Sequence, residues 1–370
     1  MALKIYIYQQ KNWPNFEWNI SEILELLTNV RNRQGRLLGR IETLGFKLKD
    51  EALLQTLTTD ILKSTEIEGS ILDEHEVRSS VAKRLGLEIG GLTSVSAEVE
   101  GVVDMILDAT INYDKPLTKE RLLDWHASLF PRGKSGMYKI KTGAWRDDSA
   151  GPMQVVSGAM GKEKVHFQAP PAESLEKEMN NFLNWFNDDR KIDLVLKAGI
   201  AHIWFVTLHP FEDGNGRIAR AITDILLARS DGVRQRYYSM SAQIEKERKK
   251  YYEILEQTQK GTLDITNWLS WFLETLLKSI ENSEKILSSV IKKHEFWNLH
   301  GDKIKNERQR KVLNLLLSNF TGNLTSSKWA KITKCSQDTA LRDIQDLMNK
   351  GILVKSNSGG RSTNYKLKDF

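Results

Sequence analysis

Hydrophobic and polar positions follow one another along most of this chain with the three- and four-residue spacing of an amphipathic helix. The spacing is clear over residues 21–41, 50–69, 96–113, 118–130, 175–187, 194–209 and 265–294. Runs that alternate at two-residue steps, as a strand would, are few. The sequence therefore predicts a mainly α-helical fold.

One segment departs from the helical pattern. The β-branched pieces "QVV" and "KVHF" flank a glycine-rich turn, and Pro170–Pro171 closes the segment. Short apolar runs on either side of such a turn are typical of a β-hairpin. By itself this pattern fits an ordinary surface hairpin as well as a functional one.

The last part of the chain has a different order of elements. Helical spacing over residues 307–320, 326–334 and 338–351 is followed by two short strand patterns within residues 352–368. Three helices and a hairpin are similar in pattern to a winged helix-turn-helix, in which the helix from Asp338 would be the recognition helix and residues 356–364 the wing. The polar residues 298–306 are predicted to be a linker. Small winged domains also dock proteins, so the pattern leaves both kinds of partner open.

Charge is concentrated in this same part of the chain. The whole chain carries a net charge of +6, but residues 302–370 hold 14 Lys/Arg against 6 Asp/Glu, which leaves about −2 for the first 301 residues. A basic terminal domain is typical of nucleic-acid binding, although a solvated surface that aids solubility gives the same composition. DNA is therefore one candidate partner.

Composition and the single cysteine limit the class of protein. With 370 residues, 40% of them apolar and 28% charged, the chain is an ordinary globular protein with room for two or three domains. Cys335 is the only cysteine, so an intrachain disulfide is excluded and a reducing compartment is favoured. The absence of a signal-peptide pattern and of an apolar run of ~20 residues predicts a cytoplasmic protein with no membrane role.

The densest group of chemically useful residues lies in "TLHPFEDGNGRIARAITDILLA", Thr207 to Ala228. The small residues of "DGNGR" precede a helical pattern, so their backbone amides would form an anion site at a helix N-terminus. Asp213 beside that site would repel an anion unless Mg²⁺ bridges the carboxylate and phosphate oxygens. Arg217 and Arg220, three residues apart, would share one helix face and bind more phosphate oxygens. With His209 as a base, this set fits phosphoryl or nucleotidyl transfer.

His209-Pro-Phe-Glu-Asp213-Gly-Asn-Gly-Arg-Ile-Ala-Arg220 resembles the HxFx[D/E]GNGRxxR signature of the Fic-domain (Fido) family at every fixed position. The similarity extends over roughly residues 117–277. It implies a helical Fic core with a small β-hairpin flap, an N-terminal helical extension and a C-terminal winged domain. We therefore expect an N-terminal helical region in 1–115, a Fic core with the following long helix in 116–298, and the winged domain in 299–370.

The resemblance also implies a reaction and a role for each residue of the motif. AMP would pass from ATP to a Tyr, Ser or Thr hydroxyl of a target protein, with His209 taking the hydroxyl proton as pyrophosphate leaves. Asp213 would hold Mg²⁺. Phosphate oxygens would be bound by the amides of Gly214, Asn215 and Gly216 and by the side chains of Arg217 and Arg220.

Two further segments acquire roles from the same resemblance. The predicted hairpin resembles the flap that aligns a target segment by strand addition, which assigns this role to Val155, Val156, Ser157 and Gly158. The segment "RKKYYEILEQTQKG" resembles the one that closes the adenosine pocket, which assigns that role to Tyr251, Tyr252 and Gln259. Paired tyrosines on a helix are also a common feature of an apolar core.

A second motif lies near the N-terminus, in "LKSTEIEGS". Gly69 is the expected C′ residue of a helix, and a carboxylate at Glu68 in the last turn opposes the helix macrodipole unless a cation compensates it. Ser64 to Gly69 also resembles the inhibitory [S/T]xxxE[G/N] pattern of the family. The resemblance implies that Glu68 pairs with Arg220 in the space of the ATP γ-phosphate.

These features predict a Mg²⁺- and ATP-dependent protein adenylyltransferase that is autoinhibited by Glu68. Two alternatives remain open: removal of AMP from a modified protein in the same pocket, with Glu68 orienting water, and a DNA-binding regulator whose Fic core senses a nucleotide. The expected partners are a target protein with a reactive hydroxyl, DNA at the C-terminal domain, and a second copy of the chain in a homodimer.

Overall fold

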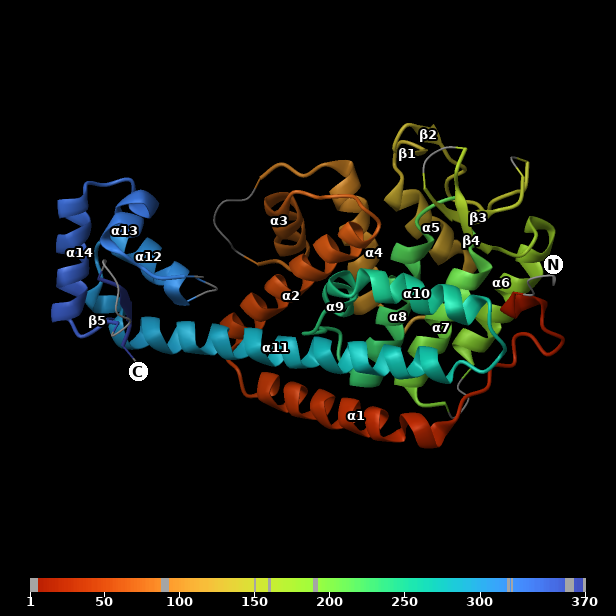
Figure 1. Cartoon of the computed structure of the whole chain (residues 1–370), viewed down its shortest axis with the longest axis horizontal. Coiled ribbons are helices and arrows are strands. Elements are labelled where there is room, and N and C mark those ends of the chain that lie inside the picture. The colour runs from red at the N-terminus through yellow and green to blue at the C-terminus, as the bar shows by residue number, and fades with distance from the viewer. Residues whose placement is uncertain are drawn as a thin grey trace. The chain divides into compact units, whose positions relative to one another are not determined.

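The computed structural model describes residues 6–87, 93–149, 151–158, 161–188, 192–317, 320, 322–356 and 363–368. The chain divides into two compact units, Met1–Ser283 and Glu284–Phe370. Helices dominate, with small antiparallel hairpins between them (Figure 1), so the predicted mainly α-helical fold with a β-hairpin is confirmed. No helix in the described ranges has both the length and the apolar character needed to cross a membrane.

The first unit is built mainly from helices, and its first described element is the short 3₁₀ turn η1 (Ile7–Gln9). In chain order these are α1 (Ile20–Glu42), α2 (Phe46–Ile67), α3 (Glu74–Arg84), α4 (Ala97–Ile111), α5 (Lys119–Leu129), α6 (Ala172–Asn187), α7 (Leu194–Leu208), α8 (Asn215–Asp231), α9 (Met240–Lys246), α10 (Arg248–Gln259) and α11 (Thr266–His300). Its hairpins are β1 (Lys134–Ser135) with β2 (Tyr138–Lys139), and β3 (Gln154–Ser157) with β4 (Lys164–Gln168).

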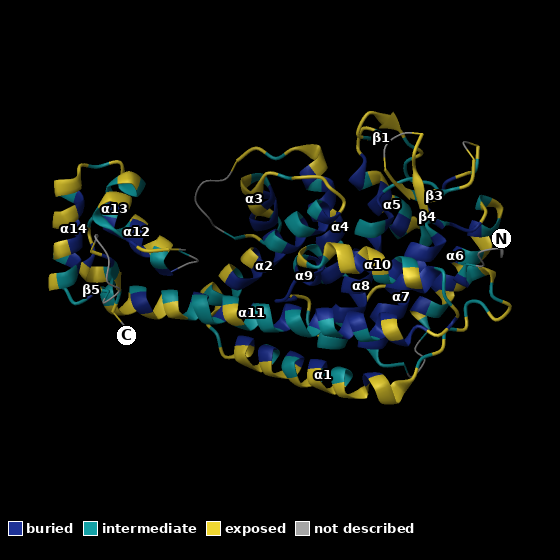
Figure 2. Ribbon diagram, in the orientation of Figure 1, coloured by how far each residue is buried: buried dark blue, intermediate teal, exposed yellow. Residues whose placement is uncertain are grey.

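Helix α7 is the centre of this unit. Every residue from Val195 to Leu208 is buried, and α7 and α8 are dark blue over most of their length in Figure 2. A helix that is apolar on all sides must be surrounded by other elements, because no face of it can be left in water without losing hydrophobic burial. The loop that joins α7 to α8 holds the sequence motif, so this motif is fixed between two buried helices.

A buried ionic cluster joins α2 to α8. Arg236, in the segment after α8, pairs with Asp224 of α8 and lies 3.8 Å from Asp60 of α2, and all three side chains are buried. Ser239 donates a 2.6 Å hydrogen bond to Asp60. The cluster fixes α2, which carries Glu68 at its end, against the helix that begins in the motif loop.

The second unit contains the end of α11, the 3₁₀ turn η2 (Gly301–Lys303), α12 (Glu307–Leu317), α13 (Ser326–Thr333), α14 (Gln337–Asn349), and the hairpin of β5 (Leu353–Lys355) with β6 (Tyr365–Leu367). Its core packs around apolar side chains that include Trp329 and Ile344. The order of elements is the one the sequence predicts for a winged helix-turn-helix. In the expected wing, residues 357–362 lie outside the described residues.

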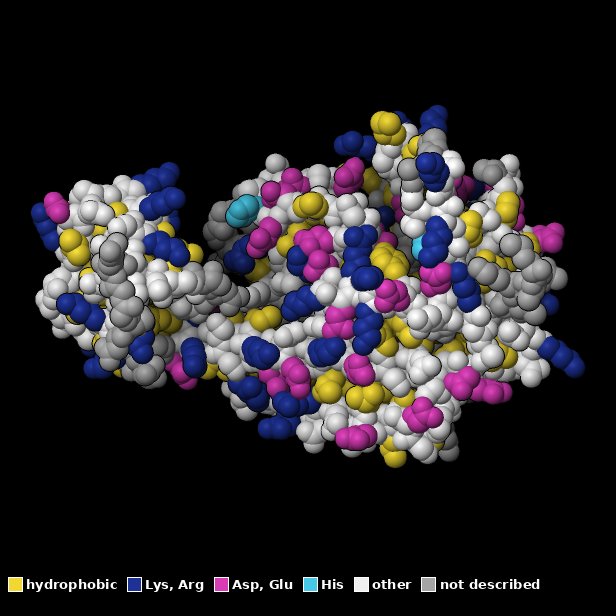
Figure 3. Space-filling model, viewed as in Figure 1, with side chains coloured by type: hydrophobic (Ala, Val, Ile, Leu, Met, Phe, Trp, Pro, Cys, Tyr) yellow, Lys and Arg dark blue, Asp and Glu magenta, His cyan; other side chains and the backbone are white. Residues whose placement is uncertain are grey.

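One sequence expectation differs from the structure. The predicted linker 298–306 is wrong at its start, because residues up to His300 continue α11 and Gly301–Lys303 form a 3₁₀ turn. On the face shown in Figure 3, lysine and arginine side chains lie on both units, and the second unit shows few acidic side chains. Its binding to DNA stays a prediction.

The buried cluster generates a stability prediction. Replacing Arg236 by Met keeps the volume but leaves Asp60 and Asp224 buried without their cation, which should lower the free energy of unfolding by about 3–5 kcal/mol. Urea unfolding would measure it. The matched control is Lys249→Met, whose side chain is 93% exposed and whose replacement should change stability by less than about 0.5 kcal/mol. Equal unfolding midpoints for the two variants would refute the structural role of the cluster.

Candidate active site

The loop between α7 and α8 ends in a helix N-terminus with amides directed outward. The first hydrogen bond of α8 runs from the Ile218 amide to the Gly214 carbonyl, so the amides of Asn215, Gly216 and Arg217 precede it. Gly214 has φ +81°, a left-handed conformation that glycine adopts without strain. Such an end attracts anions because its amides and the helix macrodipole act together.

The asparagine of the motif shapes the loop with its side chain. Asn215 donates a 2.8 Å hydrogen bond to the Phe211 carbonyl and accepts one of 3.0 Å from the Phe211 amide. Phe211 is fully buried, with its ring stacked on His126 at 4.1 Å between centroids. The aromatic side chain thus anchors the loop from below while Asn215 closes it from the side.

His209 ends α7 in a left-handed conformation, with φ 48° and ψ 57°. This conformation is uncommon for a residue with a Cβ. Arg146 stabilises it here, because its Nε donates a 2.8 Å hydrogen bond to the His209 carbonyl. Burial, with Arg146 acting in the same direction, lowers the pKa of His209 to about 4. Nδ1 lies 3.4 Å from the Val206 carbonyl, which can only accept, so the neutral ring keeps the lone pair of Nε2.

Glu68 follows α2 and reaches the same helix N-terminus. Its carboxylate pairs with Arg220 at 2.8 Å, and a Cβ on Gly216 would lie 2.2 Å from its Oε1. Arg220 is buried and also donates to Ser64, at 2.9 Å to Oγ and 2.7 Å to the carbonyl oxygen. Gly69 has φ +84°, the conformation expected after a helix end. Glu68 therefore places a carboxylate where an anion would bind.

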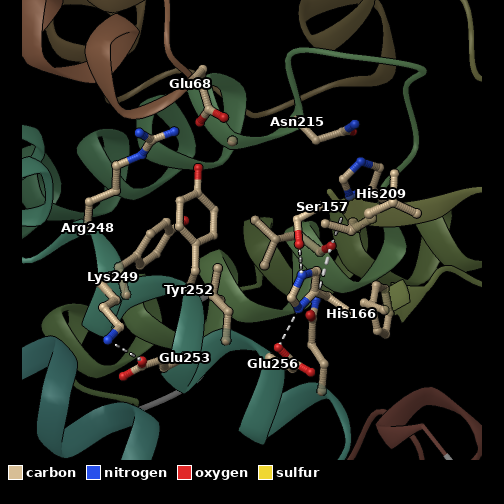
Figure 4. A pocket seen from close by; sticks show the side chains of 18 of the residues that line it. Glu68, Ser157, His166, His209, Asn215, Arg248, Lys249, Tyr252, Glu253 and Glu256 are labelled. Atoms are coloured by element: carbon tan, nitrogen blue, oxygen red, sulfur yellow. Dashed lines mark hydrogen bonds and ion pairs between the residues drawn. The ribbon is translucent and has the colours of Figure 1, made fainter. Parts of the chain in front are cut away.

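Glu68, His209, Asn215 and Gly216 line a cavity of about 880 Å³ (Figure 4). The β3–β4 hairpin and α10 form its other walls. The predicted residues that line it are Glu68, Val155, Val156, Ser157, His209, Asn215, Gly216, Tyr251, Tyr252 and Gln259. Gly158 lies at the turn after β3, with φ +110°. The structure thus gathers the predicted flap, motif and inhibitory residues from four separate parts of the chain around one space.

Comparison with known proteins agrees with this arrangement. Residues 116–227 match the family described as Fic/DOC family. Residues 6–87 match a domain of unknown function, DUF4172. Members of the Fic/DOC family typically use ATP and Mg²⁺.

Named relatives cover only part of the chain. A probable protein adenylyltransferase of Aquifex aeolicus is 28% identical over 28% of this chain and 30% of its own length. A protein adenylyltransferase of Nematostella vectensis is 36% identical over 27% of this chain and 22% of its own. The chain thus spans less than a third of either relative. The crystal structure of a Fic family protein from Desulfovibrio desulfuricans covers 94% of this chain and 96% of its own, with a TM-score of 0.51 and 19% identity, which supports the fold.

The start of α8 and its surroundings present donors whose chemistry fits a nucleotide with a bound metal. Arg217 Nε and Arg220 Nη1 are buried and have no hydrogen-bond partner among the described residues, so each has a donor that no described group uses. Asp213 lies beside the anion site and accepts hydrogen bonds from the Ser135 hydroxyl and the Gly214 amide. A single carboxylate next to phosphate oxygens is a common way to hold Mg²⁺. The Gly214 amide contacts Asp213 here, which leaves the next amides for phosphate.

The residues predicted to close the adenosine pocket have contacts of two kinds. Tyr251 is buried, and its hydroxyl lies 2.9 Å from Nε2 of His202, so it is also a core residue. Tyr252 is more exposed, and its hydroxyl donates a 3.2 Å hydrogen bond to the Ile67 carbonyl at the end of α2. Gln259 lies 3.4 Å from both the Val206 carbonyl and the Thr207 hydroxyl. Tyr252 therefore connects the cavity wall to the segment that carries Glu68.

Sequence reasoning missed several residues that the structure brings to this site. Arg146 holds the His209 backbone, Ser135 reaches Asp213 from the β1–β2 hairpin, and His166 and Glu256 line the cavity. None of them belongs to a local motif. Each acts through a contact between distant parts of the chain, for which one sequence carries no spacing signal.

The motif loop generates a second prediction. In the Gly214→Ala variant, an alanine would have to adopt the left-handed backbone conformation of Gly214. Its Cβ would also lie 2.9 Å from the Phe130 ring. We expect a loss of about 1–3 kcal/mol in the free energy of unfolding, measured by urea titration. The control is Gly35→Ala in α1, where a Cβ meets nothing within 4 Å and should stabilise by about 0.5–1 kcal/mol. If both alanines have the same effect, the tight loop packing is wrong.

Proposed function

We propose that this protein transfers AMP from ATP to a hydroxyl group of a target protein, and that Glu68 restrains the reaction. One observation carries the proposal: His209, with a lone pair on Nε2, and the backbone amides at the start of α8 line the same cavity. A base beside an anion site is the equipment for nucleotidyl transfer. The Fic/DOC family, which implies protein targets, supports the same conclusion.

In this proposal His209 accepts the proton of the target hydroxyl as the hydroxyl oxygen attacks the α-phosphorus. The bond from that phosphorus to the bridging oxygen breaks, and pyrophosphate leaves. The amides of Gly216 and Arg217 and the guanidinium groups of Arg217 and Arg220 hold phosphate oxygens. Asp213 would hold Mg²⁺, whose positive charge would stabilise the phosphate oxygens.

Glu68 restrains the reaction because its carboxylate and a phosphate group of ATP compete for the same position at the start of α8. The Glu68 carboxylate lies against Gly216 and pairs with Arg220, so it takes the contacts that a phosphate group would use. Its negative charge also repels the triphosphate. ATP can then bind productively only if Glu68 moves away from the helix end.

The first functional test is His209→Ala. Loss of the base should lower the rate of AMP transfer to other proteins by at least about 10²-fold, because general base catalysis contributes 10²–10⁴-fold. ATP affinity should stay close to that of the parent, since the phosphates are held by α8. Transfer of labelled AMP to lysate proteins and ATP titration would measure the two quantities.

The exposed His75 provides the control for that test. His75→Ala should transfer AMP at the parent rate. If His209→Ala still transferred AMP at the rate of His75→Ala, His209 would not be the base.

The second functional test is Glu68→Gly. Removing a charge-assisted hydrogen bond of about 1.5–3 kcal/mol from the restrained state should raise AMP transfer about tenfold or more. Incorporation of label from ATP at equal protein concentration would measure the change. The same variant should lose any removal of AMP, because the carboxylate that could orient water would be gone.

Glu66→Gly is the matched control, because Glu66 is in the last turn of the same helix and pairs with Lys63. It loosens the helix end without touching Arg220, so its transfer rate should stay near the parent. Equal rates for Glu68→Gly and Glu66→Gly would remove Glu68 as the inhibitory residue.

A further inference from the structure

The β3–β4 hairpin contains one extra residue on β4. Val155 pairs with Phe167 and Val156 pairs with Val165, so His166 lies between two paired positions without a partner of its own across the ladder. This is a β-bulge, which bends a strand and redirects the side chain at the bulge. Bulges are frequent beside active sites for that reason. Here the redirected side chain is an imidazole.

His166 connects a serine on the hairpin to a carboxylate on α10. Its Nε2 lies 2.6 Å from the Ser157 hydroxyl, and its Nδ1 lies 2.6 Å from the Glu256 carboxylate. Figure 4 shows the three side chains in one line along the cavity wall. Lys260 also pairs with Glu256.

The direction of each hydrogen bond can be assigned. Burial acts to raise the pKa of Glu256, but hydrogen bonds and charge from Lys260 and His166 lower it to about 2. Glu256 is therefore ionised near neutral pH and can only accept, so Nδ1 of His166 donates to it. In the neutral ring the lone pair is then on Nε2, where it faces the Ser157 hydroxyl.

A serine, a histidine and an acid joined in this order form the arrangement that activates a serine nucleophile, recognised by geometry on unrelated folds. Ser157 is exposed, so its hydroxyl is accessible to a reactant. It also lines the same cavity as His209 and Gly216. The activated hydroxyl therefore faces the space in which the proposed function binds ATP.

We propose that Ser157 is itself an acceptor of AMP, so that the protein modifies its own hairpin. In this step Ser157 Oγ forms a bond to the α-phosphorus of ATP while Nε2 of His166 takes the hydroxyl proton. The bond from the α-phosphorus to the bridging oxygen breaks, and pyrophosphate leaves with its electron pair. The inference rests on the proposed function, because it uses the same nucleotide.

The experiment locates AMP on the full chain. Glu68→Gly protein is incubated with ATP and Mg²⁺ in the presence of lysate proteins, digested, and mapped by peptide mass spectrometry. The adenylyl group should lie on Ser157. In the same background Ser157→Ala should lose it, and His166→Gln, which keeps a polar side chain but removes the base, should lower its rate about 10²-fold or more.

The matched control is Ser149→Ala. Ser149 is an exposed serine whose hydroxyl donates to Asp147 and has no histidine contact, so the adduct on Ser157 should form at the parent rate. Circular dichroism and thermal unfolding of each variant establish that the chain remains folded.

Two results would overturn the inference alone. If AMP is transferred to lysate proteins or to other residues of this chain while Ser157 stays unmodified, the proposed function stands and Ser157 is not an acceptor. If Ser157 is modified equally fast with Gln at position 166, His166 is not its base. If no protein in the mixture receives AMP, the proposed function itself fails.

Discussion

The ion pair between Glu68 and Arg220 joins two helix ends of opposite polarity. Glu68 adds negative charge to the C-terminal end of α2, where the macrodipole is already negative, and this end meets the positive N-terminal end of α8. A carboxylate that would be unfavourable on an isolated helix is thus stabilised by its surroundings. The same electrostatic preference makes the start of α8 attractive to a phosphate, so restraint and substrate binding depend on one source of positive potential.

The contact is part of a polar stripe along α2. Asp60, Ser64 and Glu68 are spaced by four residues and therefore lie on one helix face. Asp60 and Ser64 are buried against Arg236, Ser239 and Arg220, whereas the Glu68 side chain is 29% exposed at the cavity. The stripe begins at a buried ionic cluster and ends at the Glu68 carboxylate, which a ligand can displace. A ligand can compete for the last contact while the deeper ones keep α2 in place.

The sequence could predict those parts of the site that are continuous in the chain. The motif from His209 to Arg220, which forms a loop and the start of α8, and the helix end at Glu68 are local arrangements, whose residue types and spacing determine the backbone directly. Helical periodicity likewise predicts α7 and α11, though not the end of α11. The position of His166 depends on a pairing register between strands, and Ser135 meets Asp213 across 78 residues. Such contacts are decided by packing in three dimensions, and periodicity in one chain does not reveal them.

The extra residue in β4 makes the chemistry of the cavity wall depend on hairpin length. Side chains alternate between the faces of a strand, so a β4 one residue shorter would pair successive residues with Val156 and Val155. No imidazole would then remain outside the ladder to reach both β3 and α10. A single deletion could remove the imidazole from the cavity wall without altering any amino acid of the motif loop. Evolution of this hairpin is therefore best followed through insertions and deletions, with strand register aligned before residue identities are compared.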